Sequence, residues 1–417
     1  MRVQHAATTT APAAVSMRPW PYPYRAALAI CSDLDETPTA DDYFEMARFL
    51  NTNEKTRLGT GVDLEIGNSI YFDMPPSQFS YWNGDDAARA RVRALIQSGH
   101  IDCLHSFGDL AATRQHAGRA LDELARHGCG LKVWVDHAVA PSNFGEDIMC
   151  GSGDVAGSAV YHADLTYAFG IEYVWRGRVT SVIGQDTARR LSGIASPRHP
   201  VASAVTVARE AAKGALARAS NVKYAPHAAN EVLWPAALRS GQPVVEFLRS
   251  NPSWAGISVH DTSDGLGEVI SADLLSRLLD RQAACVLYTH LGKTKLPGRA
   301  VAPNTRRALD LVARARADGD LMVTTTRRLL DFCRARRTVS WTAAADGDGV
   351  RIDVSTAALP SIERRRLEGL TFYAETTAKL RLIVDGGEEQ ALRVNPPDHT
   401  GRPSVSIAWP RLSFPQL

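Results

Sequence analysis

The sequence is 417 residues long, and it has little cysteine and no long apolar run. Its six cysteines form no Cys-x-x-Cys pair, and several, such as Cys31 and Cys285, lie inside short apolar runs. This pattern predicts small buried side chains and argues against a disulfide framework or a zinc–thiolate site. No run reaches the roughly 18 apolar residues that span a bilayer, and no signal-peptide pattern opens the sequence. We therefore expect a cytoplasmic protein without membrane insertion.

Neither sign of charge dominates the chain. The 47 lysines and arginines nearly cancel 45 aspartates and glutamates, so nothing points to a nucleic acid or an anionic membrane as partner. A hydrophobic content of 45% is that of a globular protein and excludes wholesale disorder. Ten of the 12 histidines lie between His100 and His290, which places the expected chemistry in the first three quarters of the chain.

Short apolar runs of strand length alternate with amphipathic helical stretches between residues 25 and 337. Such alternation indicates parallel βαβ units, and roughly seven of them favour a closed (β/α) barrel over an open sheet. The predicted strands are 26–31, 101–104, 131–135, 172–175, 256–259, 284–289 and 321–323. The predicted helices are 41–50, 87–97, 112–127, 160–169, 201–218, 272–280 and 305–317.

The two ends of the chain differ from this central part. Residues 1–24 are rich in Thr, Ala and Pro and are expected to form a loose, flexible tail. Residues 338–417 contain no cysteine and read as short alternating segments separated by turns such as Asp-Gly-Gly. That spacing predicts a small antiparallel β-sandwich as a C-terminal accessory domain.

The strongest candidate residues stand where the predicted strands end, because functional side chains of a (β/α) barrel project there. The first strand is followed by Ser-Asp-Leu-Asp-Glu, which contains Asp33 and Asp35. Two carboxylates so close together repel each other unless a positive group lies between them, and a divalent metal is one such group. One carboxylate would then be a ligand and the other a base. The alternative is a helix cap followed by surface carboxylates.

Later strand ends carry further ionisable residues. His105 and Asp109 are four residues apart, so that one helical turn would direct both toward a single ion. A loop could serve equally. The remaining candidates include residues expected to contact the substrate, and they are Asp136, His137, Trp175, Arg176, His260, Asp261 and His290.

Three segments, RAALAICSDLDE, SGHIDCLHSFGDL and VLYTHLG, resemble in order and spacing the first, second and last motifs of the polysaccharide deacetylase superfamily. The resemblance covers residues 20–337 and implies a distorted (β/α)7 barrel, and hence an α/β protein followed by the small all-β sandwich. It implies that Asp33 is the catalytic base, that Asp35 and His105 hold a metal, and that His290 is the general acid. The implied reaction removes an acetyl group from an N-acetylated sugar of a surface polysaccharide or its precursor.

Three departures from the family pattern are present. Leu34 separates the two aspartates, so the base and ligand roles of Asp33 and Asp35 could be exchanged. Asp109 stands where the family has its second metal-binding histidine. Zinc remains the expected metal, and the added carboxylate favours Mn²⁺, Mg²⁺ or Ca²⁺ more than a second histidine would. The family's arginine motif after the third strand is absent, and Asp136 or His137 is expected to orient the base instead. The chain resembles a divergent branch, similar to deacetylase-like proteins of O-antigen and capsule gene clusters.

Two other readings of these residues stay open. A glycoside hydrolase would need paired carboxylates, and Asp33 with Asp136 or Asp261 could provide them. A protein that binds glycans without catalysis could keep the barrel and use its β-domain for contact. A serine hydrolase is not expected, because no Gly-x-Ser-x-Gly motif occurs.

Overall fold

The computed structural model describes residues 15–33, 36–138, 140–188, 194–195, 200–219, 224, 229–250, 260–296, 300–359, 367–375, 380–389 and 391–417. The chain divides into two compact units. One comprises Ala26–Arg327 and Leu412–Leu417, and the other comprises Met1–Arg25 and Arg328–Arg411. The candidate functional residues all belong to the first of these, which we call the large unit.

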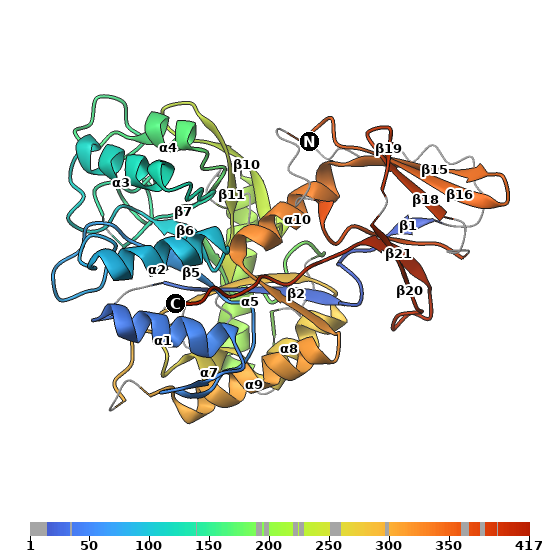
Figure 1. The fold of residues 1–417 in the computed structure, drawn as a ribbon, viewed down its shortest axis with the longest axis horizontal. Coiled ribbons are helices and arrows are strands. Elements are labelled where there is room, and N and C mark those ends of the chain that lie inside the picture. Colours follow the sequence, from blue (N-terminus) through green and yellow to red (C-terminus); the bar gives the residue numbers. More distant parts are fainter. Residues whose placement is uncertain are drawn as a thin grey trace. The chain divides into compact units, whose positions relative to one another are not determined.

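The large unit is built on one curled, mostly parallel sheet, whose described part has 11 strands (Figure 1). Its strands follow the order β10-β11-β8-β7-β6-β5-β2-β13-β12-β9, and β14 also pairs with β2. Their bounds are β2 (Ala26–Ser32), β5 (Gly67–Ile70), β6 (Ile101–His105), β7 (Val133–Val135), β8 (Tyr173–Trp175), β9 (Val179–Thr180), β10 (Leu233–Ala237), β11 (Pro243–Phe247), β12 (Arg249–Ser250), β13 (Ala284–Thr289) and β14 (Leu321–Thr324).

Strand β2 is the centre of this sheet, and all seven of its residues are buried. It pairs with β13 along most of its length, with β14 near its start and with β5 at its end. A strand covered on both faces reads as a continuous apolar run, which is why its position could be predicted from the sequence.

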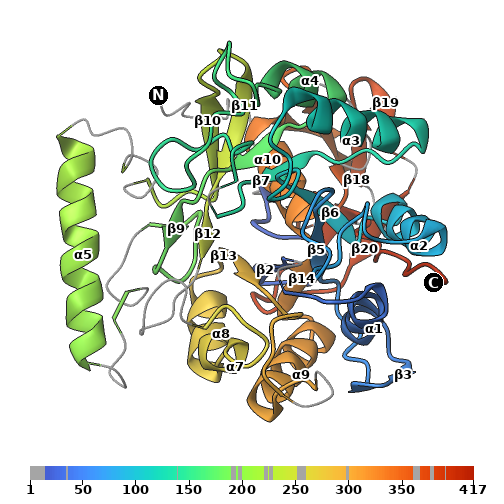
Figure 2. The ribbon, with the colours of Figure 1, turned by 90° about the vertical axis from the view of Figure 1, so that its left-hand side faces the viewer.

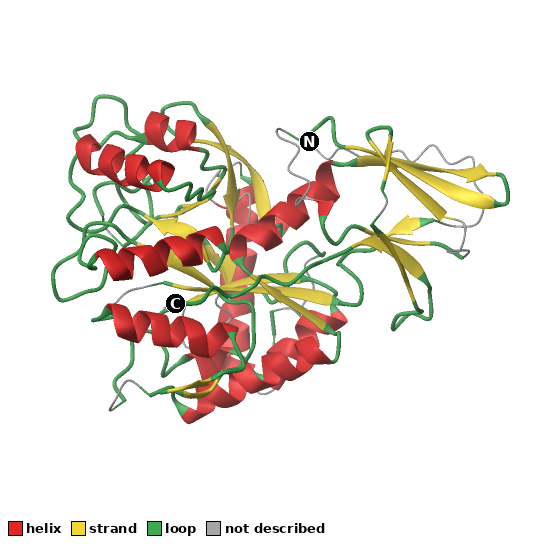
Figure 3. Ribbon diagram, in the orientation of Figure 1, coloured by secondary structure: helices red, strands yellow, loops and turns green. Residues whose placement is uncertain are grey.

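Helices follow one another around the outside of the strands (Figures 2 and 3). Side-chain caps fix several of their starts: Thr39, Asp85, Thr113 and Ser271 each accept a hydrogen bond from a backbone N–H of the first turn. The helices of the large unit are α1 (Ala40–Asn51), α2 (Asp86–Gln97), α3 (Arg114–Arg126), α4 (Ala163–Phe169), α5 (Pro200–Arg218), α7 (Leu266–Val269), α8 (Ala272–Asp280) and α9 (Pro303–Ala317). A two-stranded ribbon of β3 (Lys55–Thr56) and β4 (Gly59–Thr60) follows α1.

The packing of β2 shows which side of the sheet faces the helices. Leu28 and Ile30 lie in a core cluster with Leu274 of α8 and Leu309 of α9. Side chains alternate along a strand, so Cys31, the residue after Ile30, points to the opposite, concave side of the curled sheet. Each fully buried leucine or isoleucine contributes about 1.5–3 kcal/mol, so the helix layer holds this curvature firmly.

The second unit contains two four-stranded sheets, ordered β1-β17-β21-β20 and β15-β16-β18-β19. The pair β16–β18 is parallel, so the predicted antiparallel arrangement is wrong there. The elements of this unit are β1 (Ser16–Met17), α10 (Thr326–Thr338, which starts in the large unit), β15 (Ser340–Asp346), β16 (Gly349–Ser355), β17 (Thr371–Tyr373), β18 (Leu380–Val384), β19 (Gly387–Glu388), β20 (Leu392–Asn395) and β21 (Ser404–Ile407).

The predicted loose tail is wrong for residues 15–24. Strand β1 pairs with β17, and Arg18 is only 2% exposed because its guanidinium binds Asp398 at 2.7 Å and Tyr373 at 3.0 Å. A positive side chain so enclosed must be paired, which ties this segment to the C-terminal sheets. The unit therefore joins residues that the predicted boundaries at 25 and 338 separate.

The expected alternation of strands and helices is confirmed, but the sheet differs from a closed barrel. Within the described ranges no pairing joins its two ends, β9 and β10, and β10 runs antiparallel to β11. The predicted strand 256–259 lies outside the described residues. Strand β5 escaped prediction because its sequence, Gly-Asn-Ser-Ile, is polar, and it is buried only through its neighbours β2 and β6. No helix in the described part of the chain is long and apolar enough to cross a membrane.

Candidate active site at the carboxyl ends of the strands

Asp33 follows β2 and is locked in a buried ion pair. Its two carboxylate oxygens accept hydrogen bonds from Arg249 of β12, at 2.8 Å from Nη1 and 3.3 Å from Nη2. Asp33 is 2% exposed and Arg249 is 0% exposed. The guanidinium also lies over the rings of Trp175 and Tyr288, 4.4 and 5.3 Å from their centroids. Arg249 is therefore held by charge on one side and by aromatic faces on another.

This pair sets the charge of Asp33. Burial is the largest single influence and would raise the pKa of its carboxyl, but Arg249, His105 and His290 together outweigh it and hold the pKa well below its usual range. Burial works against the charge of Arg249 as well, yet Asp33 raises the pKa of that guanidinium further above its usual value. Asp33 is thus ionised at neutral pH, with both oxygens engaged, which makes it a weak proton acceptor.

Two carboxylate–imidazole pairs lie beside each other at this edge of the sheet. His105 Nδ1, at the end of β6, is 3.2 Å from Asp33 Oδ1, and His137 Nδ1, just after β7, is 3.0 Å from Asp109 Oδ1. The two imidazole rings are 4.8 Å apart between centroids, and the ring of Tyr71 packs against both, at 4.8 and 5.0 Å. Ser69 Oγ lies 3.2 Å from the same nitrogen of His105, so two oxygens face it. A carboxylate beside Nδ1 favours chemistry at the other ring nitrogen.

The segment from His105 to Asp109 is a loop and not the helical turn considered from the sequence. Ser106 has φ 54° and Gly108 has φ 101°, and this path turns Asp109 toward His137. The structure therefore pairs Asp109 with a histidine of the next strand rather than showing it on one helical face with His105. Asp35, the third ligand of the predicted triad, lies outside the described residues.

We expect Gly108→Ala to disturb this loop strongly. A Cβ there would lie 2.1 Å from the carbonyl oxygen of Asp73, on a residue with positive φ. Left-handed strain and overpacking each cost about 1–3 kcal/mol, so the free energy of unfolding should fall by about 2–5 kcal/mol. Urea unfolding measures the change. Gly128→Ala is the control, because Gly128 also has positive φ but has no atom within 4 Å of its Cβ position. Equal losses in both variants would contradict the close contact.

Asp136 does not orient Asp33, which was the role expected for Asp136 or His137. It is 1% exposed and accepts hydrogen bonds from the indole N–H of Trp134 at 2.7 Å and from the backbone N–H groups of Phe144 and Gly145 at 2.8 and 2.7 Å. Burial raises its pKa to about 7, although these three donors oppose the rise. Asp136 therefore fixes the loop 136–145. Arg249, and neither Asp136 nor His137, makes the ion pair that orients Asp33.

The residues expected to contact substrate are largely engaged with the protein. Arg176 donates to Glu246 at 2.5 Å, and the indole N–H of Trp175 donates to the carbonyl oxygen of Arg178 at 2.8 Å. The face of Trp175 lies against Arg249, as described above. His260 is partly exposed, and its backbone packs against Gly265.

His290 ends β13, and its Nδ1 donates to the carbonyl oxygen of Asp261 at 2.9 Å. The carboxylate of Asp261 lies 3.6 Å from the same nitrogen. The backbone acceptor keeps a proton on Nδ1.

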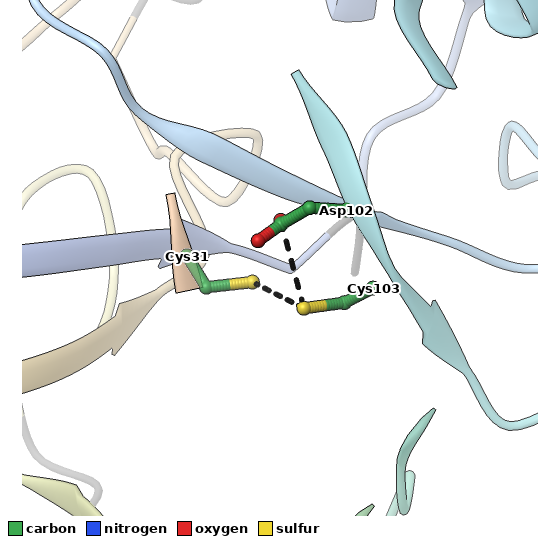
Figure 4. Close-up of side chains that lie close together, drawn as sticks. All are labelled: Cys31, Asp102 and Cys103. Carbon is green, nitrogen blue, oxygen red and sulfur yellow. Dashed lines mark hydrogen bonds between the residues drawn. The ribbon is translucent and has the colours of Figure 1, made fainter. Parts of the chain in front are cut away.

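One further cluster was not expected from the sequence. Cys31, Asp102 and Cys103 bring their donor atoms within 4.8 Å of one another, and such a group could hold a metal ion (Figure 4). All three side chains are buried. It is the one set of three His, Cys, Asp or Glu donors that converges so closely among the residues whose structure is described. The interpretation of these cysteines as isolated apolar side chains was therefore incomplete.

Two residues of the site were missed in the sequence. Arg249 directly follows the segment Val-Val-Glu-Phe-Leu at 244–248, and it would have been found by the strand-end argument had β11 been recognised. Tyr71 follows the short polar strand β5, which carries little sequence signal.

No family model matches the chain, and no curated protein matches it. Among solved structures, it is similar to 4-alpha-glucanotransferase from Thermococcus litoralis, with 12% identity and a TM-score of 0.34. The match covers 74% of this chain and 40% of that one, so the chain spans less than half the length of the enzyme. The fold described above therefore rests on this chain's own strand pairing.

Proposed function

We propose that the protein is a metal-dependent hydrolase that removes an acetyl group from an N-acetylated sugar of a surface polysaccharide or its precursor. Its core would be a distorted (β/α)7 barrel followed by a β-sandwich domain. The observation that carries the proposal is the meeting of two carboxylate–imidazole pairs, Asp33–His105 and Asp109–His137, at the carboxyl ends of β2, β6 and β7. Carboxylates that hold Nδ1 are the usual partners of metal-binding histidines.

The types of side chain gathered here would suit a divalent ion. His105 and His137 would hold it, and Asp35 remains the ligand that the family resemblance predicts. Two imidazoles with a carboxylate suit Zn²⁺ and also Mn²⁺, which agrees with zinc as the first expectation. The chemistry that such an ion supplies when bound is polarisation of the acetyl carbonyl and a lower pKa for the attacking water.

The chain's own groups would divide the remaining work. Asp33 stays ionised and positions His105, because Arg249 occupies both of its oxygens. Asp109, with a side chain 43% exposed, is the more accessible of the two paired carboxylates and would accept the proton of the attacking water. His290 would donate a proton to the departing amine, which gives a free amino sugar and acetate. This assignment moves the role of base from Asp33 to Asp109.

The glycoside hydrolase reading gains no support from the Asp33–Asp136 pair. Asp33 is bound by Arg249 and His105, and both oxygens of Asp136 accept N–H donors. A glycosidase needs one carboxyl that carries a proton and one carboxylate that faces the sugar. Neither of these buried groups is exposed to a substrate.

Acetate release tests the proposal. The full chain, given a small excess of Zn²⁺ or Mn²⁺, is incubated with N-acetylated chitooligosaccharides and acetate is measured enzymatically. We expect release that stops with EDTA and returns when the ion is restored. Release that is indifferent to EDTA would contradict a metal-dependent reaction. Cleavage to shorter, fully acetylated sugars without acetate would favour a glycosidase.

A further inference from the structure

The cluster of Cys31, Asp102 and Cys103 lies on the concave side of the sheet, below the Asp33–His105 pair. Cys31 precedes Asp33 by two residues on the β2 segment, and Cys103 precedes His105 by two residues on β6. Because side chains alternate along strands, each cysteine points to the same side as the functional residue that follows it. The cluster is thus one layer deeper in the same interior, and it contacts the pair above it through the Cys31 thiol, which lies 3.5 Å from Asp33 Oδ1.

A bulge explains why Asp102 joins the two thiols. Neighbouring residues of a strand normally point to opposite faces, so Asp102 and Cys103 should be separated. The register between β5 and β6 shifts at this point, where Asn68 pairs with Ile101 and Ser69 pairs with Cys103. Asp102 is the extra residue, and a bulge of this kind re-aims a side chain. Its Oδ1 lies 3.6 Å from the sulfur of Cys103, and its Oδ2 accepts the backbone N–H of Arg327 at 2.7 Å.

Gly67 of the intervening strand β5 leaves the space in which the donors meet. It pairs with Cys31, and a Cβ on Gly67 would lie 2.5 Å from Asp102 Oδ1. Any side chain at position 67 would push the carboxylate away from the thiols. The carboxylate therefore depends on a glycine at this position of β5.

The sulfur–sulfur distance favours a metal site over a disulfide. The two sulfurs are 3.8 Å apart, which is about the separation of two thiolates at roughly 2.3 Å from a tetrahedral zinc ion. Strands β2 and β6 are two strand spacings apart, roughly 9–10 Å in a flat sheet. A disulfide requires Cα atoms within about 7 Å, so the strands would have to move before an S–S bond could form.

We propose that Cys31, Cys103 and Asp102 form a second metal site, of thiolate–carboxylate type, for a zinc-class divalent ion. Two sulfurs and one oxygen select Zn²⁺ or Cd²⁺ over Mg²⁺ or Ca²⁺. Burial raises the pKa of the Cys103 thiol well above its usual value, so the ion displaces thiol protons when it binds. The bound ion links β2 to β6 below Asp33 and His105. The proposal does not depend on the proposed deacetylase activity, because its three ligands are not residues to which that activity assigns a role.

Cadmium is the probe, because thiolate ligation gives an ultraviolet sulfur-to-cadmium charge-transfer band. The full chain carries Cys150→Ser, which removes the exposed cysteine, and is titrated with Cd²⁺. We expect a band that saturates at one equivalent. Cys103→Ser should abolish it, and Cys285→Ser should leave it unchanged, because Cys285 is buried in β13 outside the cluster.

Two variants keep the test decisive if Cys103→Ser fails to fold. Asp102→Asn retains both thiols and should weaken cadmium affinity at least about tenfold. Gly67→Ala should do the same by displacing the carboxylate. Absence of the band in the Cys150→Ser chain, or full affinity in both of these variants, would overturn the site. His105→Ala should keep the band, so loss of deacetylase activity and loss of this site are separate outcomes.

Discussion

Replacing Arg249 by methionine is expected to lower the free energy of unfolding by about 3–5 kcal/mol, because it leaves the ionised Asp33 buried without its partner. Methionine keeps much of the volume of the side chain against Trp175 and Tyr288, so the loss reports the charge more than the packing. Urea unfolding of the full chain at pH 7 measures it. The double variant Asp33→Asn/Arg249→Met should recover most of the stability, because the amide carries no charge.

The comparison needs an exposed ion pair as its control. Arg114 and Asp164 form a two-pronged pair on the surface, with both side chains 43% exposed. Arg114→Met should cost at most about 1 kcal/mol, since solvent screens such pairs. A loss at Arg249 no larger than the loss at Arg114 would show that Asp33 is not held as described.

The same variant has a distinct response to acid. The folded-state pKa of Asp33 lies well below the unfolded value of about 3.9. The Arg249–Asp33 pair therefore stabilises the native state fully above that pH, and its contribution is lost as the pH falls toward the folded pKa. The stability difference between the natural chain and Arg249→Met should therefore narrow as the pH falls below about 5. An unchanged gap would contradict the linkage.

The strand-end argument predicted much of the site because periodicity and burial act locally. β2, β6, β7, β8 and β13 are apolar runs, and the residues after them meet at one edge for purely topological reasons. Asp33, His105 and His137 were therefore placed correctly at that edge. Which carboxylate binds which histidine depends on loop conformation, such as the positive φ of Ser106 and Gly108. The local sequence pattern does not determine this loop conformation.

Long-range pairing accounts for what could not be predicted. Arg249 and Asp33 are 216 positions apart in the sequence, and no sequence feature near either residue indicates that they pair. The closeness of Asp102 to Cys31 depends on a register shift between β5 and β6 and on the absence of a side chain at Gly67. Isolated thiols in apolar runs look alike whether or not a third donor reaches them. Sheet topology decides the difference.

Removing His137 is the prediction with the largest expected effect on activity. If the proposed deacetylase function holds, His137→Ala should lower kcat/KM for acetate release by about 10²–10⁴-fold, because it removes both a ligand and the partner of Asp109. Asp109→Asn should lower kcat by a similar factor while metal binding is retained, since the amide still contacts the imidazole but cannot accept a proton. Comparison of the two variants therefore distinguishes the loss of a metal ligand from the loss of the proton acceptor.

Metal content and rate are measured together on a Cys103→Ser background, so that the thiolate cluster contributes no ion. His127→Ala is the control, because His127 caps the end of α3 and is exposed. We expect the control to keep full metal occupancy and full rate. If His137→Ala keeps its rate, the paired histidines do not form the active site. If Asp109→Asn keeps its rate and only His137→Ala fails, the base is not Asp109, and the proton must pass to Asp33 despite the hold of Arg249 on both its oxygens.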